Sequence, residues 1–235
     1  MVRVLRNIIL WAIGVAVFSL IALLGFVGLR FFRPVHLRGL LGTLSRALLA
    51  SIGVRVKVRG IKNIDRKKEY LIVCNHESLL DVFICAGYIP LYFVAVELDE
   101  HFSWPIWGWL TKKWGNIPIT KGNLRRAKES LARACEEVRK GKSVIIFPEG
   151  ERTLDGKLRD FKKGAFFLAK EAGVDILPVA ISGLYKVKKK GDWNVTPGSV
   201  ELNIGKPIPY DVIKKETVDG LKELVKRKIE NLKKS

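Results

Sequence analysis

The sequence predicts an α/β fold, in which a mixed sheet is flanked by helices and a membrane-embedded helical pair precedes the sheet. From residue 54 onwards, short apolar runs alternate with amphipathic helical stretches, the order typical of α/β proteins. Before that point the pattern is helical, and residues 8–29 contain no charged side chain. We therefore expect N-terminal membrane-anchoring helices at residues 1–52 and an α/β domain at residues 53–235.

The first apolar stretch is long enough to reach across a bilayer. As a helix, its residues would measure about 33 Å, close to the hydrocarbon thickness. A secretory signal peptide fits less well, because the stretch is too long and no small-x-small cleavage site follows. Residues 36–51 mix leucines with arginines and predict a second, amphipathic helix. We expect the pair to be embedded in the cell membrane from its cytoplasmic side, with a full span as the alternative.

The charge balance indicates an anionic partner. Forty-two Lys and Arg against 23 Asp and Glu give a formal net charge of +19, which suits nucleic acid, an acidic protein or a membrane surface. The apolar N-terminus favours membrane lipids, and the absence of a recognition-helix motif or an aromatic single-strand platform argues against nucleic acid. Cys74, Cys85 and Cys135 have no metal-ligand spacing, so we expect buried thiols in a reducing compartment and no metal.

The elements of the domain follow from local periodicity. Strict alternation of valine with a basic residue predicts the first strand at residues 54–59. Apolar runs predict the later strands, and stripes spaced three and four residues apart predict the helices. The expected strands are 54–59, 71–74, 91–95, 117–119, 144–147, 176–181 and 200–204, and the expected helices are 79–87, 123–140, 161–172 and 218–232.

His76 and Asp81 form a candidate acid-base pair just after a buried strand. On one continuous helix, five residues would separate their side chains by roughly 140°, so they meet only if the chain turns between them. Ser78 is a suitable cap for a helix starting at Leu79, which puts His76 in the loop and Asp81 in the first turn. A carboxylate-held imidazole presents its other nitrogen to a hydroxyl. The alternative is a capping box beside an ordinary loop histidine.

A second polar cluster follows the strand at residues 144–147. Arg152 offers a planar fork of donors suited to a phosphate, and Glu149 could accept from a glycerol hydroxyl or orient the arginine. The alternative is a charged surface turn.

Four sequence blocks in a fixed order carry a resemblance to a known family. They are Asn75 to Asp81 (Asn-His-x-x-x-x-Asp), Gly115 to Lys121 (Gly-x-Ile-Pro-Ile), Phe147 to Arg152 (Phe-Pro-Glu-Gly-x-Arg) and Pro178-Val179. The chain resembles the glycerophospholipid acyltransferases, most closely the bacterial 1-acylglycerol-3-phosphate O-acyltransferases. The resemblance covers residues 54–205, and the ordered set is far more specific than any single block.

The resemblance implies direct acyl transfer from acyl-CoA or acyl-carrier protein to the sn-2 hydroxyl of lysophosphatidic acid, giving phosphatidic acid without a cofactor. His76 would take the hydroxyl proton and Asp81 would orient the imidazole. Backbone N–H groups at the first helix N-terminus or around Gly150 would meet the oxyanion. The substrate-binding residues implied are Glu149, Gly150, Arg152 and Lys121, with Asn75, Lys162 and Lys163 as further candidates.

Among the departures of the chain from the family pattern, two concern basic residues. Lys121 stands where relatives commonly have arginine, which keeps the charge but loses the bidentate geometry. A lysine that relatives carry near residues 93–98 is missing, and Lys112 or Lys113 could replace it. Acylation of glycerol-3-phosphate or another lysophospholipid is one alternative function. A basic membrane-surface scaffold without catalysis is another.

The remaining basic and aromatic groups allow two interpretations. Four tryptophans with adjacent lysines fit an interfacial segment or a partly buried helix, and a lysine run fits head-group contact or a plain surface loop. The tryptophans are Trp104, Trp107, Trp109 and Trp114, and the lysines are Lys186, Lys188, Lys189 and Lys190.

Overall fold

The computed structural model describes residues 2–120, 122 and 124–234, and it confirms the predicted α/β class. These residues form a seven-stranded mixed sheet with the order β1-β7-β6-β2-β5-β3-β4. The five strands from β6 to β4 are mutually parallel, whereas β7 is antiparallel to β6 and pairs in parallel with β1. The strands are β1 (Val54–Arg59), β2 (Tyr70–Cys74), β3 (Phe93–Leu98), β4 (Ile117–Ile119), β5 (Ser143–Ile146), β6 (Asp175–Ser182) and β7 (Gly198–Ile204).

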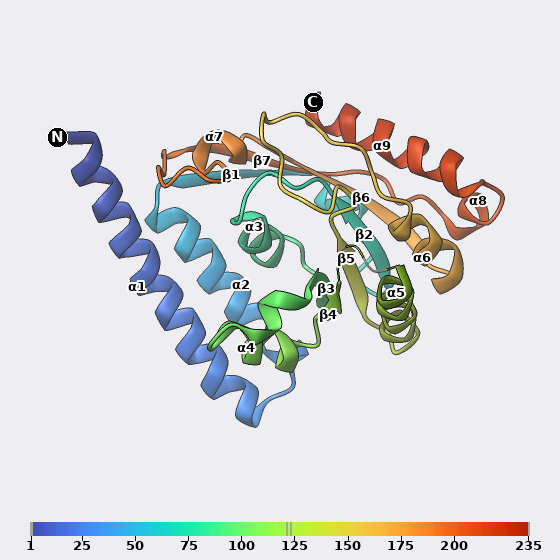
Figure 1. Cartoon of the computed structure of the whole chain (residues 1–235), viewed down its shortest axis with the longest axis horizontal. Coiled ribbons are helices and arrows are strands. Elements are labelled where there is room, and N and C mark those ends of the chain that lie inside the picture. Colours follow the sequence, from blue (N-terminus) through green and yellow to red (C-terminus); the bar gives the residue numbers. More distant parts are fainter. Residues whose placement is uncertain (1, 121, 123, 235) are drawn as a thin grey trace.

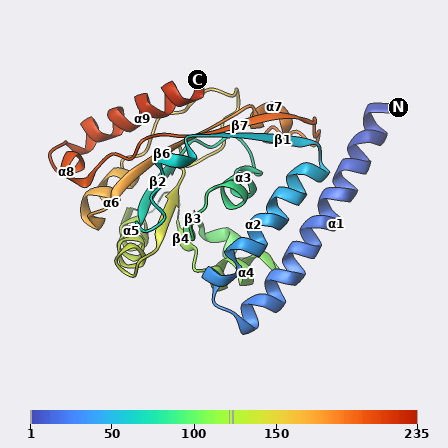
Figure 2. The same ribbon diagram turned by 180° about the vertical axis from the view of Figure 1, so that it is seen from behind.

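Helices cover both faces of this sheet (Figures 1 and 2). On one face, alternate residues of β2 such as Ile72 pack against α2, α3 and the segment after β6. On the other face, Leu71 and Val73 pack against α5, α6 and α9. The helices are α1 (Val2–Phe31), α2 (Pro34–Ser51), α3 (Asp81–Tyr88), α4 (Trp107–Trp114), α5 (Leu124–Arg139), α6 (Gly164–Ala172), α7 (Leu184–Val187), α8 (Tyr210–Ile213) and α9 (Val218–Lys234); η1 (Ile61–Asn63) and η2 (Asp99–Ser103) are short 3-10 turns.

Every predicted strand is present, but one is displaced. The third strand runs over Phe93–Leu98 instead of residues 91–95, because Val96 to Leu98 pair with β4. Leu91, expected in the strand, lies in the connection after α3 and is buried there by the core. Two helices also begin later than predicted, α3 at Asp81 instead of residue 79 and α6 at Gly164 instead of residue 161.

The two N-terminal helices pack on the domain. Leu49 and Ile52 at the end of α2 belong to the core on that face of the sheet. The α1 helix lies beside α2 and α4 (Figure 1), and it is, within the described part of the chain, the one helix long and apolar enough to cross a membrane. Much of α1 nevertheless remains exposed: only 11% of the residues in its most apolar stretch are buried inside the protein.

The topology brings the predicted site to one edge. Because β2, β5, β3 and β4 are parallel, their carboxyl ends lie at the same edge of the sheet. Ligands of open α/β sheets gather outside this edge. His76 follows β2 and Glu149 follows β5, the neighbouring strand, so the two sequence clusters become spatial neighbours.

Candidate active site

His76 and Asp81 are in direct contact. The Nδ1 atom of His76 lies 2.6 Å from Oδ2 of Asp81, as the predicted turn between them requires. Asp81 is fully buried at the first position of α3, whereas the His76 side chain is 25% exposed. A buried carboxylate next to Nδ1 favours the tautomer with the proton on Nδ1, which leaves Nε2 as the acceptor.

The turn is held by the same carboxylate. Oδ2 of Asp81 also accepts the backbone N–H groups of Glu77 at 2.7 Å and Ser78 at 3.0 Å. The bond from the Ser78 N–H resembles one half of a capping box, but the other half is absent, because the Asp81 N–H donates to the Ser78 backbone carbonyl oxygen and not to its hydroxyl. The loop from β2 to α3 is therefore fixed around the atom that orients the histidine.

The expectation that Ser78 caps the helix is wrong. The Ser78 hydroxyl donates to the carbonyl oxygen of Lys188 at 2.8 Å, and the residue before α3 is Leu80, whose side chain makes no cap bond. Ser78 is buried by this contact, and its Oγ lies 3.4 Å from the Leu80 N–H as a weak acceptor. The serine thus ties the loop between β2 and α3 to the segment after α7, and N–H groups in the first turn of α3 donate to the backbone carbonyl oxygens of Ser78 and Leu80.

The free side of the imidazole is positioned by stacking. The His76 ring lies on the Phe147 ring, with centroids 4.4 Å apart and an interplanar angle of 27°. Within the described residues, no polar group bonds to Nε2. Contacts at Nδ1 and on one ring face thus leave Nε2 available to a substrate hydroxyl.

Glu149 joins the two loops of the site. Its Oε1 accepts the His76 N–H at 2.7 Å and its Oε2 accepts the Arg159 N–H at 2.8 Å. The carboxyl group is 4% exposed, and burial raises its pKa above the ordinary value, while the two N–H donors and His76 oppose this rise. Glu149 therefore fixes the backbone at His76 to the backbone at Arg159, and both of its carboxylate oxygens take part.

Arg152 lies beside the catalytic loop with its guanidinium available. The next residue, Thr153, donates its N–H to the carbonyl oxygen of His76 at 2.9 Å. No described side chain bonds to the Arg152 guanidinium, whereas the neighbouring Glu151 pairs with Lys190 and Arg159. A half-buried, unpaired guanidinium on a residue adjacent to this backbone contact can bind a phosphate.

Gly150 is required by the turn that carries Arg152. Its φ of +71° lies in the left-handed region, and a Cβ atom there would approach the Lys162 Nζ to 2.7 Å. Its N–H donates to the Phe147 carbonyl oxygen at 3.0 Å. The N–H is therefore engaged in the turn instead of free for an oxyanion. Lys162 lies against the turn and so remains near the site.

The other predicted residues fall in several places. Asn75 binds the backbone N–H and C=O of Ile181 and so fixes the end of β2 to β6. Lys163 pairs with Asp219 on α9. Lys112 and Lys113 lie exposed in the last turn of α4, and Lys121 lies outside the described residues. The substrate-binding assignments of Lys121, Asn75, Lys162 and Lys163 stay predictions.

The structure adds a buried ion pair that the sequence pattern did not reveal. Lys233, near the end of α9, places its ammonium 2.5 Å from Oε1 of Glu77, the residue after His76. Oε2 of Glu77 accepts the Tyr185 N–H at 2.9 Å, and the glutamate is 3% exposed. Burial raises the pKa of Glu77, and Lys233 opposes that rise. The partners are 156 residues apart, so no local pattern could pair them.

We predict that Lys233→Met destabilises the protein, because removing one partner of a buried pair costs about 3–5 kcal/mol. Without the ammonium, the pKa of Glu77 rises further above its unfolded value. Stability is then retained at low pH, where Glu77 is protonated, and is lost as pH rises through the folded pKa. Thermal unfolding of the variant and wild type at about pH 5 and about pH 8 should therefore show the larger difference at the higher pH.

The double variant Glu77→Gln/Lys233→Met is the matched control. Its amide oxygen still accepts the Tyr185 N–H, and no buried charge remains unpaired. We expect it to be more stable than Lys233→Met alone. A double variant as unstable as the sum of the two single variants would show that the pair is not coupled.

Two further expectations concern lysines and cysteines. Lys188, expected on a surface loop, is instead 6% exposed, and its ammonium donates to the carbonyl oxygens of Lys189 and Asp192.

Cys74 is a buried packing residue, as expected, and burial holds its thiol pKa well above the ordinary value. Such a thiol is a poor nucleophile. Throughout the described ranges, no group of three or more His, Cys, Asp and Glu side chains is placed to hold a metal ion.

Fold and site together define an α/β protein with a hydrogen-bonded histidine-aspartate pair at the carboxyl edge of its sheet. Residues 55–182, more than half of the chain, match the model of the acyltransferase family. A 1-acyl-sn-glycerol-3-phosphate acyltransferase of Limnanthes douglasii is 31% identical over 197 residues, covering 83% of this chain and 68% of that protein. The chain belongs to the acyltransferase family.

Further relatives carry the same name. The chloroplastic protein of Arabidopsis thaliana is 33% identical over 167 residues, covering 68% of this chain and 47% of its own length. The Pseudomonas aeruginosa protein is 34% identical over 155 residues, which cover 65% of this chain and 59% of that protein. The chain thus spans about half the length of the Arabidopsis relative.

The fold also has a close match among solved structures. The crystal structure of the 1-acyl-sn-glycerophosphate acyltransferase PlsC from Thermotoga maritima superposes with a TM-score of 0.85. It covers 100% of this chain and 98% of that one at 23% identity. This match confirms the fold, including the N-terminal helices.

Proposed function

We propose that this protein transfers a fatty acyl group from acyl-CoA or acyl-carrier protein to the sn-2 hydroxyl of 1-acylglycerol-3-phosphate, giving phosphatidic acid. The observation that carries the proposal is the 2.6 Å contact between His76 Nδ1 and the buried Asp81, with Nε2 unbonded within the described residues. The names of the relatives supply the substrate class.

The reaction needs one base and no covalent enzyme intermediate. Nε2 of His76 takes the proton of the sn-2 hydroxyl as that oxygen attacks the thioester carbonyl carbon. The tetrahedral intermediate then expels the thiolate, which takes the proton from the imidazolium, so a thiol and an ester are formed. Asp81 stabilises the transient imidazolium, and Arg152 binds the acceptor phosphate.

A panel of donors and acceptors tests the proposed substrates. The full chain in detergent is given lysophosphatidic acid, glycerol-3-phosphate or lysophosphatidylcholine, each with acyl-CoA and with acyl-carrier protein, and thiol release is followed. We expect the fastest release with lysophosphatidic acid. Faster release with glycerol-3-phosphate would replace the acceptor, and no release with any pair would favour a non-catalytic scaffold.

We predict that Arg152→Gln raises KM for lysophosphatidic acid by about 10- to 100-fold, the equivalent of one charge-assisted hydrogen bond. The kcat should change less, because the phosphate does not react. Arg152→Lys retains the charge, so its KM should lie between those of wild type and Arg152→Gln. An unchanged KM in initial-rate measurements would remove Arg152 from the phosphate site.

The proposed location is the cytoplasmic surface of the cell membrane, with α1 embedded in one leaflet. The helix contacts the domain along most of its length. Asn7 binds Asn194 at 2.6 Å, Phe18 meets Phe83 with centroids 6.1 Å apart, and Phe26 meets Trp109 at 4.5 Å. From Asn7 to Phe26 an α-helix rises about 28 Å. A helix docked over that length is not free to cross a bilayer while the domain stays in water.

The outer face of α1 is suited to lipid. Its exposed side chains are apolar, for example Ile9, Leu23 and Val27, and Trp104 and Ile106 before α4 are exposed as well. Arg3, Arg6 and Arg30 mark the two ends of the helix. Apolar side chains flanked by basic ones are typical of interfacial helices.

Accessibility from sealed vesicles tests this orientation. We predict that a membrane-impermeant maleimide labels Arg3→Cys and Lys57→Cys from the same side, because α1 does not cross the bilayer. Lys57 is an exposed residue of β1 and reports the position of the domain. Labelling of Arg3→Cys exclusively from the opposite side would establish a full span.

A further inference from the structure

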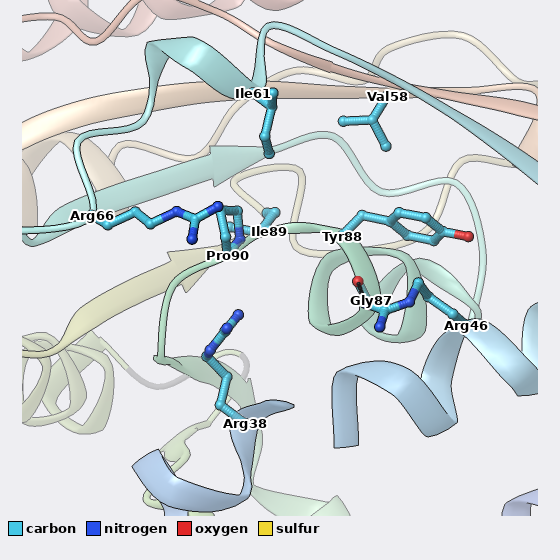
Figure 3. A pocket seen from close by; sticks show the side chains of 9 residues that line it. All are labelled: Arg38, Arg46, Val58, Ile61, Arg66, Gly87, Tyr88, Ile89 and Pro90. Atoms are coloured by element: carbon cyan, nitrogen blue, oxygen red, sulfur yellow. Dashed lines mark hydrogen bonds between the residues drawn. The ribbon is translucent and has the colours of Figure 1, made fainter. Parts of the chain in front are cut away.

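A basic cavity lies away from the candidate active site, between α2, α3 and η1. It measures about 350 Å³ (Figure 3). Arg38 and Arg46 come from α2, and Arg66 from the segment before β2. Val58, Ile61 and Ile89 give the rest of the wall an apolar character.

The cavity has three guanidinium groups and no counter-charge. Figure 3 shows the side chains of Arg38 and Arg66 converging from below and from the left, while Arg46 enters from the right and lies beside Gly87. Arg46 is held by the Gly87 carbonyl oxygen at 2.6 Å and the Thr43 hydroxyl at 2.8 Å. Within the described part of the chain, Arg38 and Arg66 have no bonded partner, and no acidic residue lines the cavity.

Converging cations without a counter-ion repel one another, and a bound anion relieves that repulsion. Guanidinium forks match the oxygen geometry of phosphate, and charge-assisted bonds to phosphate are the stronger class of hydrogen bond. Arg46 is already fixed by its two acceptors, so part of the site is preorganised before a ligand arrives.

The cavity is separate from the site at Arg152. Gly87 and Ile89 lie at the end of α3, whereas Asp81 begins that helix, an axial separation of about 10 Å or more. Arg66 precedes β2 and His76 follows it, so a strand of about 17 Å separates them. The acceptor phosphate at Arg152 therefore does not fill this cavity.

We propose that this cavity binds a phosphate group, carried by an anionic phospholipid or free in solution. The lipid source rests on the proposed membrane attachment. The α1–α2 turn exposes Phe31 and Phe32 by 78% and 59%, and Arg38 follows it by little more than one helical turn. An inserted turn would bring the cavity to the depth of the head groups, and its apolar wall would contact the glycerol carbons.

Binding is measured on the full chain in neutral detergent with Arg152→Gln as background, which weakens the substrate phosphate site. Dihexanoyl phosphatidylglycerol and inorganic phosphate are titrated separately by calorimetry. We expect saturable binding that Arg38→Gln/Arg66→Gln weakens by about tenfold or more. The control pair Arg139→Gln/Arg227→Gln removes the same charge from exposed positions on α5 and α9 and should leave binding unchanged.

The two ligands distinguish the sources. Tighter binding of phosphatidylglycerol than of phosphate assigns the site to a lipid head group, and equal binding assigns it to free phosphate. An equal loss in both variant pairs, or no saturable binding, overturns the proposal. Arg38→Gln/Arg66→Gln with Arg152 intact should still transfer acyl groups in detergent, so the failure of acyl transfer in the wild type would remove the proposed function and not this site.

Discussion

His76→Ala should fold normally and transfer acyl groups about 10³-fold more slowly than wild type, within the range that a positioned general base contributes. Among the described groups that bond to Asp81, the imidazole alone has a free basic nitrogen and partial exposure. Its side chain contributes to packing mainly through the Phe147 ring, so the fold should tolerate its removal. Steady-state thiol release with acyl-CoA and lysophosphatidic acid measures the loss.

The matched variant is His101→Ala, at a histidine that also contacts a carboxylate. His101 Nδ1 lies 3.0 Å from Oε1 of Glu97, but Glu97 also binds Trp107 and Asn116, and no bond found among the described residues joins this cluster to the loop between β2 and α3. This variant should keep most of its activity. Retained activity in His76→Ala, with a circular dichroism spectrum equal to that of wild type, would remove His76 from the mechanism.

Asp81→Asn should reduce kcat by about 10²-fold or more and also lower stability. If the amide oxygen takes the position of Oδ2, it can still accept from His76 and from the Glu77 and Ser78 N–H groups. The negative charge that stabilises the imidazolium is lost. The new NH₂ group then replaces Oδ1, which is buried and has no partner among the described residues. An unsatisfied buried donor costs about 1–3 kcal/mol.

Two measurements separate these effects of Asp81→Asn. Thermal unfolding reports the lost stability, and kcat measured well below the unfolding temperature reports the lost charge. We expect KM for lysophosphatidic acid to change little, because Arg152 is untouched. A higher KM for lysophosphatidic acid with an unchanged kcat would show that Asp81 contributes to substrate binding and does not act through the histidine.

The sequence predicted the sheet and the pair well because both depend on local signals. The β2 strand is a continuous apolar run, so its end and the position of His76 could be placed from the sequence. Asp81 follows in the same loop-to-helix connection, at the first residue of α3. The α3 start was misplaced because Ser78, a good cap by its chemistry, is used by Lys188, which lies 110 residues away.

The contacts that support the site could not be predicted from the sequence, because they also join residues that are far apart in the chain. The substrate contact expected of Glu149 stays a prediction, whereas its bonds to the backbone of His76 and Arg159 could not be foreseen, because they exist only after β2 and β5 pair. Lys233 gave no signal at all, because a lysine in the last turn of an amphipathic helix is usually solvated. Its partner Glu77 is brought to it by the packing of α9 on β6.

Formation of phosphatidic acid by the purified full chain tests the central claim most directly. Wild type and His76→Ala receive acyl-CoA and lysophosphatidic acid, and thiol and phosphatidic acid are quantified in the same reaction. The proposed mechanism predicts a one-to-one ratio of the two products in wild type and background levels of both in His76→Ala. Thiol release without phosphatidic acid, or equal phosphatidic acid from both proteins, would contradict it.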